Sequence, residues 1–129
     1  MPLNIRFHDE ALSICQLALD APAPVEILRY PFTAFFRTKD EVTLICPTAM
    51  VPKNAKVESG FIPFEIVGPF EFDVIGILAQ VANPLAAAGV SIVPLSTFNT
   101  DYVLIKADRR QTAVNTLSKA GHNVLENSL

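Results

Sequence analysis

The chain lacks the features by which nucleic-acid-binding proteins are usually recognised. Its 129 residues include no tryptophan and only two tyrosines, so few side chains can stack on bases. Ten basic and thirteen acidic residues are interspersed, give a formal charge of −3, and contain no basic run longer than Arg109-Arg110. Binding to nucleic acid requires a concentrated positive face. We therefore expect no nucleic-acid partner.

Catalytic motifs are also missing. The sequence contains no G-x-G-x-x-G, no G-x-x-x-x-G-K-[ST] and no G-x-S-x-G, and it has only five glycines in all. Phosphate-binding loops and a serine-hydrolase nucleophile therefore have no candidate. His8 and His122 have no cysteine or carboxylate at metal-ligand spacing and are expected at the surface or at strand ends. We expect no catalytic activity, no metal and no other cofactor.

The chain has no long uninterrupted apolar run. Its most apolar stretch, 74–95, is broken by a glutamine, an asparagine, a proline and a glycine, whereas a membrane-spanning helix needs about 20 predominantly apolar residues. The N-terminus has no positively charged region leading into a hydrophobic one. We expect a cytoplasmic protein without membrane contact. Cys15 and Cys46 are then small buried hydrophobes, because a disulfide between them would need neighbouring strands and is rare in that compartment.

What the sequence does have is a high apolar content in short, patterned segments. Half of the residues are apolar and the mean hydropathy is +0.36, which suffices for the core of one compact body or of two small interlocked ones. Alternating residues in the first part predict a strand, a short helix and a hairpin, followed by a loop with at most one helical turn. In chain order these segments are 12–17, 24–29, 32–38 with 41–46, and 47–60.

The second part begins with a strand at Phe61 and contains the longest helix. Apolar residues at i, i+1, i+4, i+5, i+8 and i+9 predict a helix over 77–88, with Asp73 as a cap near Val74. Pro84 lies inside this helix and predicts a kink or an early stop, and Gly89 is expected to end the helix in a left-handed conformation.

Two further apolar runs, 92–95 and 102–105, flank the polar cluster 96–101 and predict an antiparallel hairpin. Pro94 fits an edge strand, where its missing donor faces away from a neighbour. A second helix and a last strand at 123–126 follow, and the residues expected to cap, bury and end that helix are Asp108, then Ala113, Val114 and Leu117, then Gly121.

A longer pattern spans these segments. Residues 68–105 read G-P-x-[ED]-F, G-I-L-A, P-L-A-x-A-G-[VI]-S-I and [LI]-S-T-[FY]-[ND]-T-D-Y-[VI]-L-[IV], with 14–17 and 36–46 extending the similarity upstream. This resembles the ACT domain, and more narrowly a small group of stand-alone tandem ACT proteins related to aspartokinase regulatory domains and to a eukaryotic cytosolic arginine sensor. The resemblance implies an α+β fold of two ferredoxin-like βαββαβ units with antiparallel sheets. These would be a degenerate unit at 1–60 and a complete one at 61–129, and the sequence leaves open whether 3–7 or 123–126 completes the first.

The resemblance also implies a site for an amino acid at an interface between ACT units. Backbone N–H groups near Gly76, at a helix N-terminus, suit an α-carboxylate, and Asp101 could balance a cation. The matching positions are Asp73, Val74, Ile75, Gly76 and Ile77 before and at the helix, and Leu95, Ser96, Thr97, Phe98, Asn99 and Asp101 in the hairpin.

Other interpretations stay open. In the alternative interpretation, Ser96 and Thr97 only satisfy strand-end donors, Asp101 is the residue of an Asx turn, and Gly76 only relieves crowding between helix and strand. We expect Arg37, in the first half, to pair with a carboxylate. The chain is expected to be a homodimer with a two-fold axis, although the two halves could satisfy each other within one chain. An assembly module without ligand is the alternative to a sensor, and a small enzyme is a third reading.

Overall fold

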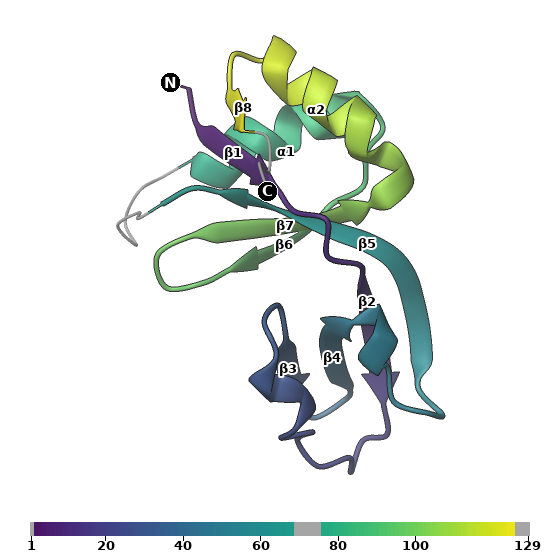
Figure 1. Ribbon diagram of the computed structural model, residues 1–129. Coiled ribbons are helices and arrows are strands. Elements are labelled where there is room, and N and C mark those ends of the chain that lie inside the picture. Colours follow the sequence, from purple (N-terminus) through teal and green to yellow (C-terminus); the bar gives the residue numbers. More distant parts are fainter. Residues whose placement is uncertain (1, 69–75, 126–129) are drawn as a thin grey trace. The chain divides into compact units, whose positions relative to one another are not determined.

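The computed structural model describes residues 2–68 and 76–125 and shows a mixed α+β chain (Figure 1). The chain divides into two compact units, one made of Met1–Asp9 with Ile62–Leu129 and the other of Glu10–Phe61. We call them the larger unit and the inserted unit. The first nine residues thus cluster with the C-terminal part of the chain.

The inserted unit is an antiparallel sheet with strand order β3–β4–β2–β5. Its strands are β2 (Leu12–Leu17), β3 (Ala34–Arg37), β4 (Val42–Pro47) and the first part of β5 (Lys56–Ile66). The expected strand at 12–17 and the hairpin are confirmed. The connection from β2 to β3 contains only the 3-10 turn η1 (Ile27–Arg29), and the connection from β4 to β5 contains only the 3-10 turn η2 (Thr48–Met50).

The loop expected over 47–60 is wrong in its second half, because β5 already begins at Lys56. Residues 56–60 are all exposed, so they show no apolar alternation by which a strand could be read. They pair with β2, and the register shifts before Phe61, where Gly60 adopts φ +89°. The hydrogen bonds of β2, rather than burial, therefore make this segment a strand.

The core of the inserted unit contains both cysteines. Cys15, Leu44 and Cys46 are buried, with apolar side chains of η1 and η2 packed against them. The cysteines are free and lie diagonally on neighbouring strands, because Cys46 pairs directly with Ser13. Burial raises the pKa of both thiols, and the closeness of Cys15 contributes to a pKa of about 11 for Cys46. The interpretation of both residues as small buried hydrophobes is confirmed.

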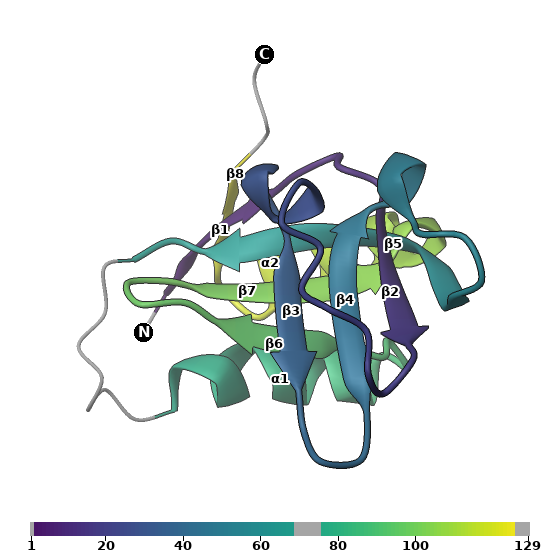
Figure 2. The ribbon, with the colours of Figure 1, turned by 90° about the horizontal axis from the view of Figure 1, so that it is seen from below.

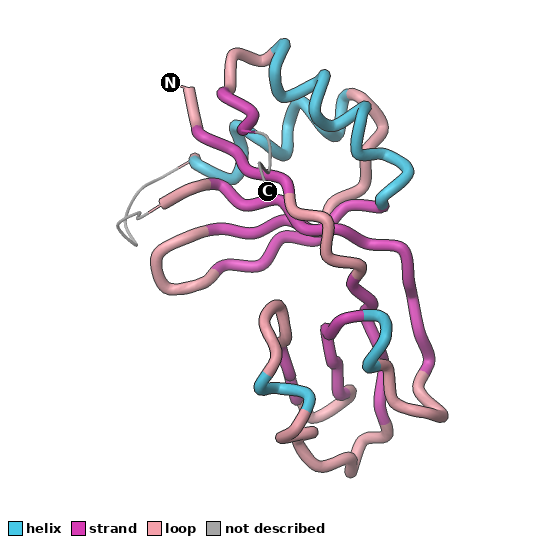
Figure 3. Tube along the Cα trace, viewed as in Figure 1, coloured by secondary structure: helices cyan, strands magenta, loops and turns pink. Residues whose placement is uncertain are grey.

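The larger unit carries both α-helices (Figure 3). Its sheet has the order β6–β7–β5–β1–β8, in which β1 is antiparallel to β5 and parallel to β8. Both segments that the sequence had offered to the first unit, β1 and β8, thus lie in the larger one. The additional elements are β1 (Asn4–Phe7), α1 (Ile77–Ala87), β6 (Val93–Ser96), β7 (Asp101–Lys106), η3 (Ala107–Arg109), α2 (Arg110–Lys119) and β8 (Asn123–Leu125).

The helices cover one face of this sheet and form the core with it. Val81 and Leu85 of α1 and Ala113 and Leu117 of α2 are fully buried. They pack against inward-facing strand residues, namely Ile5, Phe7, Ile62, Phe64, Ile66, Val103 and Ile105. The fold is consistent with the ferredoxin-like class. The predicted helix faces are confirmed except at Ala86, which is exposed. Pro94 lies on an edge strand as predicted, since β6 pairs with β7 alone among the described strands.

Three local predictions need correction. The first long helix begins at Ile77 with Gly76 as its N-cap, so the cap expected at Asp73 is wrong, and Asp73 itself lies outside the described residues. Asp108 lies in the preceding 3-10 turn, and the N-cap of α2 is Arg109. Arg37 donates to the carbonyl oxygens of Leu19 (2.6 Å) and Ala21 rather than to a carboxylate. Neither N-cap residue of the two helices forms a side-chain capping hydrogen bond, and Arg37 is bonded to backbone carbonyl oxygens instead of a carboxylate.

Candidate functional site

The predicted polar cluster is the turn of the β6–β7 hairpin. Ser96 pairs directly with Asp101, and the Ser96 hydroxyl donates to Asp101 Oδ1 at 2.9 Å. Thr97 closes the turn, because its N–H and its hydroxyl both donate to the Thr100 carbonyl, at 2.8 and 2.7 Å. The hairpin end is therefore held by its own hydrogen bonds, among them the one between Ser96 and Asp101.

Strand alternation assigns these residues to different faces of the sheet. Val103 and Ile105 belong to the core under the helices, so Asp101 shares their face and Ser96, its partner, lies there too. Leu95 pairs with Tyr102 and faces the opposite side. The six hairpin positions predicted for one site are thus divided, and Ser96 with Asp101 is the pair on the helix-covered face.

The start of α1 offers a second polar feature of the same unit. Gly76 is the N-cap with φ +82°, no side chain of the described residues is recorded as capping this end, and the first turn contains no acidic residue. An added Cβ at Gly76 would meet no atom within 4 Å, so the space beside this backbone is open. Unbonded N–H groups and the helix dipole make such an end attractive to an anion. Ile77, by contrast, packs against the core.

The two features lie at the same end of the larger unit. In both ribbon views the start of α1 and the tip of the β6–β7 hairpin are on the same side (Figures 1 and 2). Phe98, at the tip, is 76% exposed, and Asn99 is an exposed turn residue. Val74 and Ile75, like Asp73, lie outside the described residues. Joint binding of one ligand by Gly76 and Asp101 stays a prediction.

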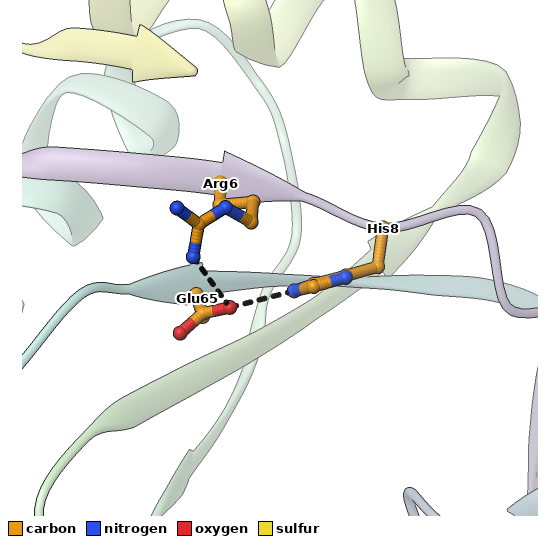
Figure 4. A network of polar contacts seen from close by, with 3 residues as sticks. All are labelled: Arg6, His8 and Glu65. Carbon is orange, nitrogen blue, oxygen red and sulfur yellow. Dashed lines mark hydrogen bonds and ion pairs between the residues drawn. The ribbon is translucent and has the colours of Figure 1, made fainter. Parts of the chain in front are cut away.

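A polar cluster on the other face was not predicted (Figure 4). Arg6 and Glu65 are direct cross-strand partners, and Glu65 Oε1 lies 3.6 Å from Arg6 Nη1 and 2.7 Å from His8 Nε2. Their neighbours Ile5, Phe7, Phe64 and Ile66 face the helices, so the cluster is on the helix-free face. The charges of this cluster act on Tyr102. Burial raises the pKa of the Tyr102 hydroxyl, the charge of Glu65 raises that pKa further, and the charge of Arg6 lowers it. The cluster could not be predicted from the sequence, because a single sequence does not show that β1 pairs with β5.

The described residues contain neither a metal-ligand cluster nor a membrane-spanning element. No three His, Cys, Asp or Glu side chains within 2–68 and 76–125 come together as a metal site. None of the helices in this part of the chain combines the length and apolarity that crossing a bilayer requires.

Comparison with known proteins defines the class of the larger unit's main segment. Residues 56–119 match the family model of the ACT domain. Over this segment the chain is similar to the ACT domain, and ACT domains are regulatory ligand-binding domains.

Individual relatives agree with this assignment. The human protein named cytosolic arginine sensor for mTORC1 subunit 1 is 43% identical over 51 residues, which are 40% of this chain and 16% of the human protein. An Agobacterium tumefaciens protein solved by X-ray crystallography is 27% identical, with a TM-score of 0.91 over 100% of this chain and 96% of that one. The ligand-free regulatory subunit of aspartate kinase from Thermus thermophilus shares the fold, with 14% identity and a TM-score of 0.64 over 88% of this chain and 93% of the subunit.

Proposed function

We propose that this protein is a cytoplasmic regulatory sensor of tandem ACT type that binds an amino acid and has no catalytic activity. The observation that carries the proposal is the arrangement at one end of the larger unit of the α1 N-terminus, whose N-cap is Gly76, and the hydrogen-bonded Ser96–Asp101 pair. An α-amino acid presents a carboxylate and an ammonium group, and these are the charges that a helix N-terminus and an aspartate stabilise.

The strand order of the inserted unit supports the tandem part of the proposal. In a ferredoxin-like βαββαβ unit, the last strand lies beside the first, the first beside the third, and the third beside the second. The order β5–β2–β4–β3 reproduces this, with η1 and η2 in the places of the two helices. The inserted unit is then a degenerate ACT unit, and the larger unit has the same order with β1 added between its first and last strands.

In the proposed site, the ligand carboxylate accepts hydrogen bonds from the first turn of α1. The ammonium group lies against Asp101, whose Oδ1 accepts from Ser96 while Oδ2 has no hydrogen-bond partner in the described part of the chain. Thr97 adds a further hydrogen bond. The complete set comprises Asp73, Val74, Ile75, Gly76, Ile77, Leu95, Ser96, Thr97, Phe98, Asn99 and Asp101.

The test is a thermal-shift screen of the common amino acids, beginning with arginine because the human relative is named for it. A ligand at a hundred times its dissociation constant should stabilise the fold by about 2.7 kcal/mol. Calorimetric titration of Asp101→Asn should then show roughly tenfold to hundredfold weaker binding, since a hydrogen bond to a charged group is worth about 1.5–3 kcal/mol.

Asp108→Asn is the matched control, because Asp108 is exposed in η3 and is not part of the proposed site. It should bind as the unchanged protein does. Unaltered binding by Asp101→Asn, or binding lost only because that variant unfolds, would favour a purely structural Asp101.

One observation favours a second function, that of an assembly module. Strand β6 is an edge of the larger unit, and its free side could pair with the same strand of a second copy around a two-fold axis. A homodimer of this kind is compatible with the sensor. Light scattering that gave the mass of a monomer at high micromolar concentration would exclude it. A dimer that none of the amino acids stabilises would favour the module without ligand.

A further inference from the structure

A pocket of about 370 Å³ lies in the larger unit, at the end of α2. It is lined by Pro2, Gln80, Ala120, Gly121 and His122. None of these residues belongs to the proposed amino-acid site, so this is a separate pocket. Its volume is at the lower end of the range of about 300–1,000 Å³ that small-molecule sites occupy. The pocket is more open than enclosed, so a ligand of modest size would be only partly buried in it.

His122 fixes one wall of the pocket. The residue is 9% exposed, its Nδ1 accepts a hydrogen bond of 3.1 Å from the Leu3 N–H, and its Nε2 lies 3.1 Å from the Gln80 carbonyl oxygen. An N–H group can only donate and a carbonyl can only accept, so the ring has one unprotonated and one protonated nitrogen. In this arrangement the imidazole is neutral and both of its nitrogens are occupied.

The backbone that carries His122 is fixed as well. The N–H groups of Ala120, Gly121 and His122 donate to Thr116, Ser118 and Leu117 carbonyls at 3.0, 3.0 and 3.1 Å. Gly121 turns the chain with φ +97°. A wall that is ordered before binding lowers the entropy that a ligand has to overcome.

The side chain of Gln80 is the polar group that this pocket leaves available. It comes from the second turn of α1, where the backbone N–H donates to Gly76 and the carbonyl accepts from His122. Its carboxamide has no hydrogen-bond partner among residues 2–68 and 76–125, and it is only partly exposed. A carboxamide offers a donor and an acceptor side by side.

The lining residues also define the charge of the ligand. With His122 neutral, none of the five carries a formal charge. A charged ligand would lose hydration here without an opposite charge to replace it, which is costly. An uncharged primary amide avoids this cost, and its N–H and C=O complement those of Gln80.

We propose that this pocket is a second binding site, for a small uncharged molecule that carries a carboxamide and pairs with Gln80. The site is independent of the amino-acid site at Gly76 and Asp101. Its ligand lies against Pro2 and Ala120 with its apolar part, while the amide forms two hydrogen bonds with the Gln80 side chain.

Benzamide and benzoate are suitable probes, because they have nearly the same shape and differ in charge. In NMR titrations of the full chain, benzamide should cause saturable shifts of the Gly121 and His122 amides and of the Gln80 side-chain amide. Benzoate should cause none there. Gln80→Leu should weaken benzamide binding roughly tenfold or more, as expected for the loss of two hydrogen bonds.

Gln111→Leu is the control, since Gln111 is an exposed glutamine of α2 whose side chain donates to Asn115 at 2.9 Å. It should bind benzamide as the unchanged protein does. If Gln80→Leu does not fold, Gln80→Glu provides the same test, because a carboxylate cannot donate to the amide carbonyl of the probe. No saturable shift with benzamide, an equal response to benzoate, or full binding by a folded Gln80 variant would overturn the proposal. Each result is independent of whether an amino acid binds at Asp101.

Discussion

His122 is expected to stabilise the larger unit by joining its N-terminal strand to α1, and His122→Ala tests this. The imidazole bonds to Leu3, just before β1, and to Gln80 in α1, and the Leu3 side chain is buried. In the alanine variant the Leu3 N–H loses its partner, and an unsatisfied buried donor costs about 1–3 kcal/mol. Loss of the ring also removes packing, so we expect a total destabilisation of about 2–4 kcal/mol.

Two further variants separate the hydrogen bonds. In His122→Asn the side-chain oxygen can occupy the place of Nδ1 and keep the bond to Leu3, so it should cost about half as much as alanine. His8→Ala is the control, because His8 follows β1 as well but is bonded to Glu65 and is partly exposed. It should cost about 1 kcal/mol or less.

The assay is urea denaturation with a fixed slope, combined with hydrogen exchange of the Leu3 amide. The Leu3 amide should lose protection in His122→Ala and keep it in His122→Asn. A cost below about 0.5 kcal/mol for His122→Ala, or a control that is equally damaging, would refute the reasoning, because such small effects are typical of ordinary surface substitutions.

Two other predictions concern titratable groups. Glu65→Gln should lower the pKa of Tyr102, because the Glu65 charge is the second cause of its rise, whereas burial, the largest cause, should keep this pKa above its usual value. Ultraviolet titration in a Tyr30→Phe background isolates Tyr102. An unchanged titration midpoint would exclude the coupling between Glu65 and Tyr102. Cys46, with a pKa raised from 9.0 to about 11, should make stability fall as the pH rises from about 9 to 11, because the unfolded thiol ionises first and the folded one resists. Cys46→Ala should remove most of that slope in denaturation experiments, and an unchanged slope would show that other groups cause it.

The sequence predicted the elements whose burial is periodic. The helix over 77–88 and the buried positions Ala113 and Leu117 were readable because one face of each helix is apolar and the other polar. Pro94 was placed on an edge strand because a missing N–H is tolerated there. In each case a local physical constraint was enough.

Features that depend on pairing between distant segments were not predicted. The start of β5 at Lys56 has no buried face and is a strand only because β2 lies beside it. The buried position of His122 and its bond to Leu3 depend on the passage of the N-terminus beside β8, 119 residues away in sequence. The Arg6–Glu65 pair likewise follows from β1 and β5 becoming neighbours.

Some of the backbone geometry around the candidate site could be predicted from the sequence. The pairing of Ser96 with Asp101 follows from hairpin register, and Gly76 was recognised as a special backbone position. The division of the hairpin residues between two faces could also have been predicted from strand alternation. The resemblance to a family concerns the motif as a whole and does not distinguish its two faces. Leu95 is the residue most affected, since it lies opposite the Ser96–Asp101 pair.

The place of β1 in the sheet has a consequence for synthesis on the ribosome. Residues 10–61 contain all four strands of the inserted unit and can close as soon as they emerge, whereas β1 must wait for the second part of β5 and finally for β8. Until then Ile5 and Phe7, fully buried in the finished protein, have no sheet to join. Long-range strand pairing is intrinsically slow and exposes apolar surface to aggregation. Pulse-labelled hydrogen exchange during refolding should accordingly protect the amides of β4 before those of β1.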